Sequence, residues 1–204
     1  MNNFIHPTAH VESQVQMGYG NYIGPFCYLT GKLTVGNHNR FEAFCSVGTR
    51  PEHKDYWDED GETIIGDNNV FREHITIHSG SFGLTIIGDD CIMLRGSHVA
   101  HDCILEDRVT LSVNAIMLGH VFVMHDSNCG SGCQVHQHQV VGAWSMIGMG
   151  CVIPKKTRIS PGQVWVGNPG KPIKANDYLM KDVTEKQLNS VTERFLTLRE
   201  KHGL

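Results

Sequence analysis

Apolar residues recur at every sixth position along most of the chain. A first run of eight hexads is followed by a break over residues 48–64, a run of three hexads, a slip of four residues and a final run of 14 hexads. The apolar positions are Ile5, Val11, Met17, Ile23, Leu29, Val35, Phe41, Val47, then Ile65, Phe71, Ile77, then Ile87, Met93, Val99, Leu105, Leu111, Met117, Val123, Cys129, Val135, Val141, Ile147, Ile153, Ile159 and Trp165. These 25 hexads make an internal repeat the dominant feature of the sequence.

A period of six predicts a β-helix, in which short strands are joined by turns and one apolar residue of each hexad points inward. Three hexads form one coil of about 18 residues, so the chain forms about eight coils. With strands about 4.8 Å apart, the stack is on the order of 40 Å tall. Glycine often follows the inward residue, as in Ile23-Gly24 and Val35-Gly36. We expect these glycines to occupy turns with positive φ, and the fold class to be an all-β solenoid.

Two segments break the phase and are expected to leave the prism as loops, at about 49–62 and 79–84. The first, TRPEHKDYWDEDGE, is charged, and the second, SGSFGL, is short. Loops on a rigid scaffold commonly carry binding residues, although a solvated insertion without a role is an equally open interpretation.

The pattern changes to a helical one after the sequence GNPGKP. Thr184 and Gln187 have the spacing of a capping box, and apolar residues then recur at helical spacing. We therefore expect a β-helix domain over residues 1–173 and a short C-terminal α-helical segment over 174–204. One amphipathic helix there would serve as a packing or subunit-contact element.

Composition narrows the functional classes. Only 40% of the 204 residues are hydrophobic, and no run approaches the ~20 apolar residues of a membrane span. The N-terminal sequence MNNFIHPTAH lacks the features of a secretory signal, so a cytoplasmic location is expected. Seven cysteines without a C-x-x-C pair argue against a disulfide framework or zinc ribbon. A net charge of −4 predicts no general attraction to nucleic acid.

The coil length converts sequence spacing into geometry. Residues three hexads apart occupy the same place on adjacent coils, so His101, Gly119 and Gln137 are predicted to form one column. Asp102, His120 and His138 form the next column, and His98 and His136 belong to the same corner. None of these side chains occupies an inward position, which disfavours a core role. Surface decoration remains an alternative, because a β-helix exposes most of its side chains.

This corner suits acyl transfer by base catalysis. A neutral imidazole takes a proton from a hydroxyl or amine near pH 7, and an adjacent carboxylate selects its tautomer. His101 is the candidate base, with Asp102 as its partner. The backbone N–H of Gly119 is a candidate oxyanion donor, since the missing side chain allows close approach. Cys103 is interpreted as a small packing residue and not as a nucleophile.

The sequence resembles the hexapeptide-repeat acyltransferases, most closely the UDP-N-acetylglucosamine O-acyltransferases of lipid A biosynthesis. The segments that carry the resemblance are IHPTA (5–9), IGPFC (23–27), IGDNN (65–69), FREHITIH (71–78), HVAHDC (98–103), LGHV (118–121) and VHQ (135–137). They occur in order over about residues 5–170. The HVAHDC and LGHV pair together with VHQ is the specific part, because the repeat itself serves many unrelated activities.

The resemblance implies a left-handed parallel β-helix and a homotrimer with active sites between neighbouring subunits. It implies general-base catalysis by His101 with Asp102, and an oxyanion-hole amide at Gly119. The residues it assigns to binding of the sugar nucleotide and acyl chain are His98, His120, His136, Gln137 and Asn168. The donor would be a thioester on acyl carrier protein, used as co-substrate, with no bound cofactor.

The chain also departs from the family. A substrate-binding Lys that stands beside a Tyr in the family is here Asp55, with Lys54 one place early. An Arg pair associated with the nucleotide phosphates is replaced by Met180-Lys181. Met149 stands where the family can have Gly at the end of the acyl pocket, which implies a shorter acyl chain. GNPGKP resembles the end of coenzyme-A-dependent sugar O- or N-acetyltransferases, so coenzyme A remains an alternative thioester carrier.

Two other classes share this fold. The γ-class carbonic anhydrases bind a metal through three His, with a pair spaced H-x4-H. Here His98 and His101 are separated by two residues and no third ligand is evident, so we expect no metal site. A noncatalytic scaffold is the remaining class, and the crowding of His, Asp and Gln on one corner argues against it. The sequence leaves open which sugar nucleotide is the acceptor and whether oxygen or nitrogen is acylated.

Overall fold

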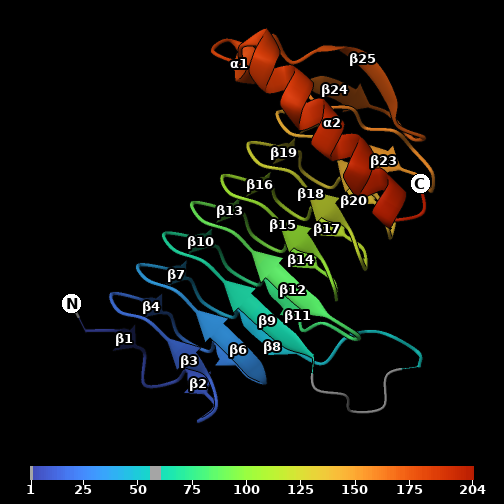
Figure 1. Ribbon diagram of the computed structural model, residues 1–204. Helices are drawn as coiled ribbons and strands as arrows, with labels where there is room; N and C mark the ends of the chain where they lie inside the picture. Colours follow the sequence, from blue (N-terminus) through green and yellow to red (C-terminus); the bar gives the residue numbers. More distant parts are fainter. Residues whose placement is uncertain (1, 56–60) are drawn as a thin grey trace.

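We describe a computed structural model of the protein that covers residues 2–55 and 61–204. The chain winds into a tall parallel β-helix with three sheets as its faces, and a helix lies against one side of its C-terminal end (Figure 1). The hexad pattern dictates this form, because one inward residue every six positions leaves a turn between each short strand and the next.

Up to β23, each of the three sheets takes every third strand of the chain, and β24 and β25 extend the first sheet. The first sheet contains β1 (Phe4–Ile5), β4 (Tyr22–Ile23), β7 (Arg40–Phe41), β10 (Val70–Phe71), β13 (Ile92–Met93), β16 (Thr110–Leu111), β19 (Asn128–Cys129), β22 (Met146–Ile147), β24 (Gln163–Val166) and β25 (Lys171–Ala175). The second contains β2 (His10–Val11), β5 (Tyr28–Leu29), β8 (Ser46–Thr49), β11 (Thr76–His78), β14 (His98–Val99), β17 (Ile116–Met117), β20 (Gln134–Val135) and β23 (Val152–Ile153). The third contains β3 (Gln16–Met17), β6 (Lys32–Val35), β9 (Glu62–Ile65), β12 (Leu84–Ile87), β15 (Ile104–Leu105), β18 (Phe122–Val123) and β21 (Val140–Val141).

The strand register confirms the coil length and locates both interruptions. Val99 pairs with Met117, the residue that a coil of three hexads predicts. Val35 pairs with Ile65, a longer interval, because an extra segment is inserted between β8 and β9. Ile65 in turn pairs with Ile87, because the shorter insertion between β11 and β12 lengthens that coil as well. The first insertion follows β8 and the second follows β11. These two strands pair in the second sheet, so the insertions lie on neighbouring coils.

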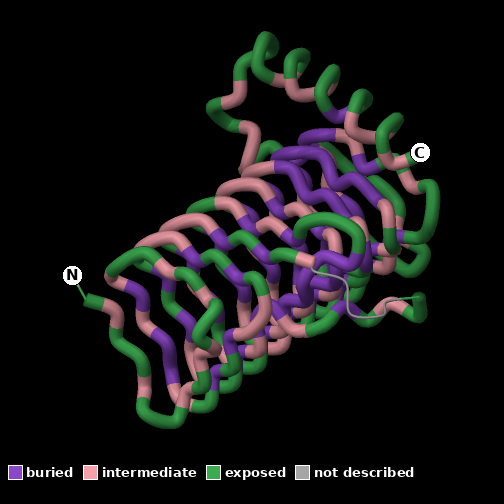
Figure 2. The backbone as a smooth tube through the Cα atoms, turned by 60° about the horizontal axis from the view of Figure 1, so that its bottom comes forward, coloured by how far each residue is buried: buried purple, intermediate pink, exposed green. Residues whose placement is uncertain are grey.

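The predicted inward residues form the core of the prism. All of them are buried except Ile5, Val11 and Met17, which belong to the first coil and have no coil beneath them. Figure 2 shows the buried segments recurring along successive coils behind this exposed first turn. Full burial of an aliphatic side chain contributes about 1.5–3 kcal/mol, so the inward residues of all three sheets favour stacking of the coils.

The expectation that glycines after the inward residues have positive φ holds at Gly48 and is wrong at most of the other positions. Gly24 does not have positive φ, and the left-handed turn positions are mostly non-glycine, as at Asp102 and His120. Gly24 is required for space instead, because a Cβ there would lie 2.8 Å from the carbonyl oxygen of Phe41 on the next coil. Close approach of stacked backbones is therefore what favours glycine after the inward residue.

The C-terminal segment contains more than the single helix that the sequence predicts. β25 runs antiparallel to β24 across the expected boundary at residue 173, and a one-turn helix, α1 (Asp177–Met180), follows it. The predicted helix is α2 (Glu185–Lys201), and its Thr184 and Gln187 capping box is confirmed. Phe195 of α2 is fully buried in a second apolar cluster on the outside of the coils. In the part of the chain that the structure describes, no helix meets the length and apolarity of a membrane span.

Candidate functional site

The predicted histidine columns exist. The turns after β14, β17 and β20 lie directly over one another, because His120 N–H donates to the carbonyl of His101 and His138 N–H donates to that of Gly119, each at 3.0 Å. Asp102, His120 and His138 each have a left-handed φ near 60°, so each turn presents its side chains in the same direction. The regular stacking of coils therefore creates the corner.

His101 and Asp102 form a buried pair on this corner. Nδ1 of His101 lies 2.8 Å from Oδ2 of Asp102. His101 is 8% exposed, although it lies outside the core column. Its ring stands edge-on to that of His120, with centroids 5.1 Å apart. We call His101, Asp102 and His120 the corner cluster.

Asp102 is held by groups that the sequence analysis missed. Ser81 donates to it from both its hydroxyl, at 2.5 Å to Oδ2, and its backbone N–H, at 3.1 Å. The Asp102 N–H donates in turn to Oγ1 of Thr85. Burial alone would raise the pKa of the Asp102 carboxyl, but the hydrogen bonds from His101 and Ser81 outweigh it and hold that pKa well below its usual range. The carboxylate is thus ionised and fixed.

Gly119 stands against the His101 ring. A Cβ at this position would lie 2.6 Å from Cε1 and 2.7 Å from Nε2 of His101, so no other residue fits without moving the ring. Within residues 2–55 and 61–204, the Gly119 N–H has no hydrogen-bond partner. An unpaired backbone donor therefore lies beside the edge of the imidazole that faces away from Asp102.

The two loops cover His101. The ring of His53, from the first loop, stands edge-on to His101 at 5.2 Å and to Phe82, from the second loop, at 5.3 Å. This cover explains how a histidine on the outer surface of a β-helix is buried. Only the position of these residues in the predicted loops hinted at such a role.

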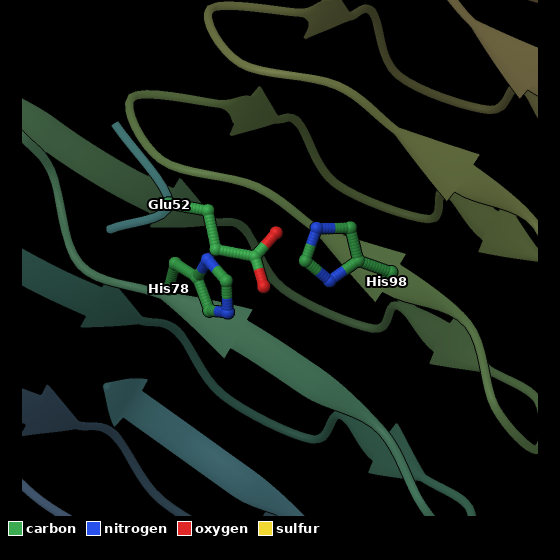
Figure 3. A group of neighbouring side chains, drawn as sticks. All are labelled: Glu52, His78 and His98. Atoms are coloured by element: carbon green, nitrogen blue, oxygen red, sulfur yellow. The ribbon is translucent and has the colours of Figure 1, made fainter. Parts of the chain in front are cut away.

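A second group of side chains lies beside the corner cluster. Glu52, His78 and His98, which we call the loop cluster, point toward one another from the first loop, β11 and β14 (Figure 3). Their donor atoms all lie within 4.8 Å of one another, as do those of the corner cluster. Both clusters therefore have the composition and spacing to hold a metal ion.

The loop cluster is only partly hydrogen-bonded. Nδ1 of His98 pairs with the hydroxyl of Thr76 at 2.7 Å. Nδ1 of His78 is buried with no partner among the described residues, and the two rings stand edge-on at 4.9 Å. Burial lowers the pKa of His78 to about 4 and also lowers that of His98, so both rings are neutral near pH 7.

The remaining column residues are spread along the corner. His120 stacks on His138 with centroids 4.4 Å apart, and burial lowers the pKa of both despite the nearby Asp102. His136 turns its Nδ1 to the backbone carbonyl of Gln137 at 3.1 Å. Gln137 is exposed and lines a separate cleft of about 280 Å³ near the end of α2. These residues therefore follow one another along the stack of coils and do not surround His101.

Three expected site residues are exposed on the surface of this chain. Asn168 is exposed in the turn between β24 and β25, where its bond to Pro169 is cis. Met149 is 81% exposed, and Lys54 is exposed on the first loop next to His53. Tyr56, the expected partner of the family's lysine, lies outside the described residues.

A cleft lies beside the loop cluster. It has a volume of about 910 Å³ and lies between the first coils and the first loop. Its wall includes Glu52, His78 and Ser79, together with Thr49 and Arg50 at the start of the loop. A polar ligand in this cleft would therefore reach the loop cluster first.

The corner cluster has the chemistry of a proton acceptor. A carboxylate at Nδ1 selects the imidazole tautomer that carries its proton there, which leaves Nε2 free to accept another. The unpaired N–H of Gly119, a residue that packs against the ring, is a donor for an oxygen that becomes negative during reaction. Burial raises the pKa of the Cys103 thiol to about 12, so this residue is an inert packing group, as expected.

Comparison with known proteins gives a consistent picture. No family model matches the chain. Over 189 residues the chain is 35% identical to the acyl-[acyl-carrier-protein]--UDP-N-acetylglucosamine O-acyltransferase of Paraburkholderia phymatum, an alignment that spans 82% of this chain and 71% of that protein.

Solved structures agree with this similarity. LpxA from Acinetobacter baumannii matches 94% of this chain and 83% of its own with a TM-score of 0.80 at 27% identity. UDP-N-acetylglucosamine acyltransferase from Campylobacter jejuni matches 95% of this chain and 83% of its own with a TM-score of 0.78 at 26% identity. The predicted left-handed parallel β-helix is confirmed.

Proposed function

The chain belongs to the UDP-N-acetylglucosamine O-acyltransferase family and is an acyltransferase, and from this premise we propose that it acylates UDP-N-acetylglucosamine, with an acyl carrier protein thioester as donor. The product would enter lipid A synthesis in the cytoplasm. The observation that carries the proposal is the buried His101–Asp102 pair beside the unpaired N–H of Gly119. These are the groups that base-catalysed acyl transfer needs.

The proposed reaction uses both nitrogens of His101. Nε2 removes the proton from the acceptor hydroxyl while Asp102 stabilises the imidazolium that forms. The hydroxyl oxygen then bonds to the thioester carbonyl carbon, whose oxygen becomes negative and accepts a hydrogen bond from Gly119 N–H. When the carbon–sulfur bond breaks, the departing thiolate takes the proton from His101. The base is thereby restored without a covalent enzyme intermediate.

Substrate binding would use the rest of the corner. His98 lies three residues before His101 on the same coil and His120 lies on the next coil, and we assign them, with His136 and Gln137, to the sugar nucleotide and acyl chain. Lys54 follows His53, whose ring covers His101, so we assign it to the substrate bound at the same chain's corner. Asn168, exposed in the turn between β24 and β25, would reach the substrate across an interface in a homotrimer. Sedimentation of the purified protein tests this point, because a mass of one chain would remove the reason for assigning Asn168.

Met149 is proposed to end the acyl pocket. Its side chain is 81% exposed on this chain, so a neighbouring subunit would have to supply the opposite wall. Replacing it with glycine, Met149→Gly, would lengthen the pocket and move the preferred acyl chain to a longer one. Competition between carrier-protein thioesters of different chain lengths measures that preference, and an unchanged preference would remove Met149 from the pocket.

The deciding experiment combines donors and acceptors. UDP-sugars and dTDP-sugars are incubated with carrier-protein thioesters of several lengths and with acetyl-coenzyme A, using wild type and His101→Ala. We expect turnover with UDP-N-acetylglucosamine and a carrier-protein thioester, and a loss of about 10²–10⁴-fold in the variant. Turnover with acetyl-coenzyme A alone would instead identify a coenzyme-A-dependent sugar acetyltransferase. Full activity in His101→Ala would remove the base from the mechanism.

A further inference from the structure

The loop cluster is not needed for the proton transfer at His101, and its arrangement calls for an explanation of its own. Three groups that commonly bind metals converge there from three separate parts of the chain (Figure 3). Two of them, Glu52 and His78, also line the 910 Å³ cleft. A ligand from solvent would therefore reach Glu52 and His78 through that cleft.

His78 supplies the strongest indication of a missing ligand. The residue is 7% exposed, and its Nδ1 is buried with no hydrogen-bond partner in the described part of the chain. A buried polar atom without a partner is destabilising, and native structures rarely keep one without a reason.

His98 is oriented as a metal ligand would be. Its Nδ1 is occupied by the hydroxyl of Thr76 at 2.7 Å, which fixes the ring and leaves Nε2 as the free nitrogen. Metal-bound histidines almost always have their second nitrogen hydrogen-bonded in this way. Thr76 lies on β11, one coil from His98, so the regular strand pairing itself holds the ring.

Two imidazoles and one carboxylate are a donor set that suits Zn²⁺. Around a tetrahedral Zn²⁺ with bonds of about 2.0–2.1 Å, donors lie about 3.4 Å apart. The three donor atoms here lie within 4.8 Å of one another, and Glu52 is an exposed loop residue that can move inward. We propose that Glu52, His78 and His98 bind one divalent transition-metal ion of the Zn²⁺ type, with a fourth coordination position open to the cleft.

The corner cluster has similar spacing but a weaker claim to a metal. Its carboxylate already accepts hydrogen bonds from the Ser81 hydroxyl and from Nδ1 of His101. A metal there would have to displace bonds that are formed. At the loop cluster, by contrast, His78 makes no hydrogen bond through its buried Nδ1 within the described residues, so the two clusters give opposite expectations in a binding experiment.

The test is a titration of the full chain, freed of metal by chelation, with ZnCl₂ in a calorimeter. We expect one equivalent per chain. Glu52→Gln and His78→Gln should each weaken binding at least 100-fold, because even a second-sphere partner is worth about 10–100-fold. Thr76→Val, which removes only the partner of His98, should weaken it about tenfold. His120→Gln is the matched control at the corner cluster and should bind as the wild type does.

The outcomes separate the possibilities. Absence of binding by the wild type, or wild-type affinity in Glu52→Gln, would overturn the proposal. Loss of binding in His120→Gln would place the ion at the corner cluster and overturn it too. Glu52 is exposed, so its variant remains informative if His78→Gln does not fold. Visible absorption of bound Co²⁺, lost in Glu52→Gln, provides a second readout.

This proposal goes beyond the transferase function. The titration contains neither acyl donor nor sugar nucleotide, so its failure would leave the proposed reaction intact. Equally, inactivity of the protein toward UDP-sugars would not change the number of Zn²⁺ ions bound.

Discussion

The corner cluster and the loop cluster lie side by side on the same face, yet they are completed in different ways. In the corner cluster, Asp102 is saturated by hydrogen bonds from His101 and Ser81. In the loop cluster, His78 keeps a buried nitrogen without a partner within the described residues. The stacked coils place histidines in both clusters, but the loops determine which polar atoms of each cluster have a hydrogen-bond partner. A satisfied cluster suits a fixed catalytic group, whereas an unsatisfied one suits a bound ligand.

The largest expected effect tests whether only the corner cluster carries the chemistry. Asp102→Asn removes the carboxylate that selects the His101 tautomer, and kcat should fall by about 10²–10⁴-fold. The matched change from acid to amide in the loop cluster, Glu52→Gln, should alter kcat far less. Steady-state transfer assays of both variants measure this. Equal losses would abolish the distinction between the clusters.

The next effect concerns the close approach of Gly119 to His101. Gly119→Ala places a methyl group 2.6 Å from Cε1 of the ring, which forces the imidazole or the N–H out of position. Loss of one oxyanion donor costs about 10²–10³-fold in kcat, and we expect a loss of that order. Gly132→Asn is the control, since nothing lies within 4 Å of a Cβ there and Asn tolerates its positive φ. Wild-type kcat in Gly119→Ala would exclude the proposed oxyanion contact.

Ser81 tests how far the second loop completes the corner cluster. Ser81→Ala removes the hydroxyl bond to Asp102, and the free energy of unfolding should fall by about 1.5–3 kcal/mol, the contribution of a hydrogen bond to a charged group. The pKa of the Asp102 carboxyl should rise toward its usual value, which titration of its carboxyl carbon in NMR spectra measures. Thr85→Val, which removes the acceptor for the Asp102 N–H, should destabilise the fold without raising that pKa as much. An unchanged Asp102 pKa in Ser81→Ala would contradict the assignment.

The smallest effect is the response of stability to acid. The pKa of His120 is lowered by burial, so the unfolded chain binds more protons than the folded one as pH falls below about 6.5. Stability is therefore fully present above that pH and declines below it. His120→Gln should reduce the drop in Tm between pH 7 and pH 5, and an undiminished drop in the variant would refute the assignment to His120.

The sequence alone predicted the inward residues and the histidine columns because both depend on period. Side chains alternate across a strand and coils repeat after every third hexad, so Val99 and Met117, or His101 and Gly119, follow from counting. Counting also located the two loops, since each breaks the phase. It gave a wrong reason for the glycines after inward residues, because it did not include the distance to the next coil's carbonyl.

The tertiary structure decided everything that the loops contribute. The course of a loop is not periodic, and its position depends on the surface it covers, so no spacing rule could bring Ser81 to Asp102 or His53 to His101. The same reason hid Glu52 as a possible third ligand, because the search for a metal motif followed spacing along the chain. The repeat determined where side chains stand on the prism, and the folded loops determined which of them meet.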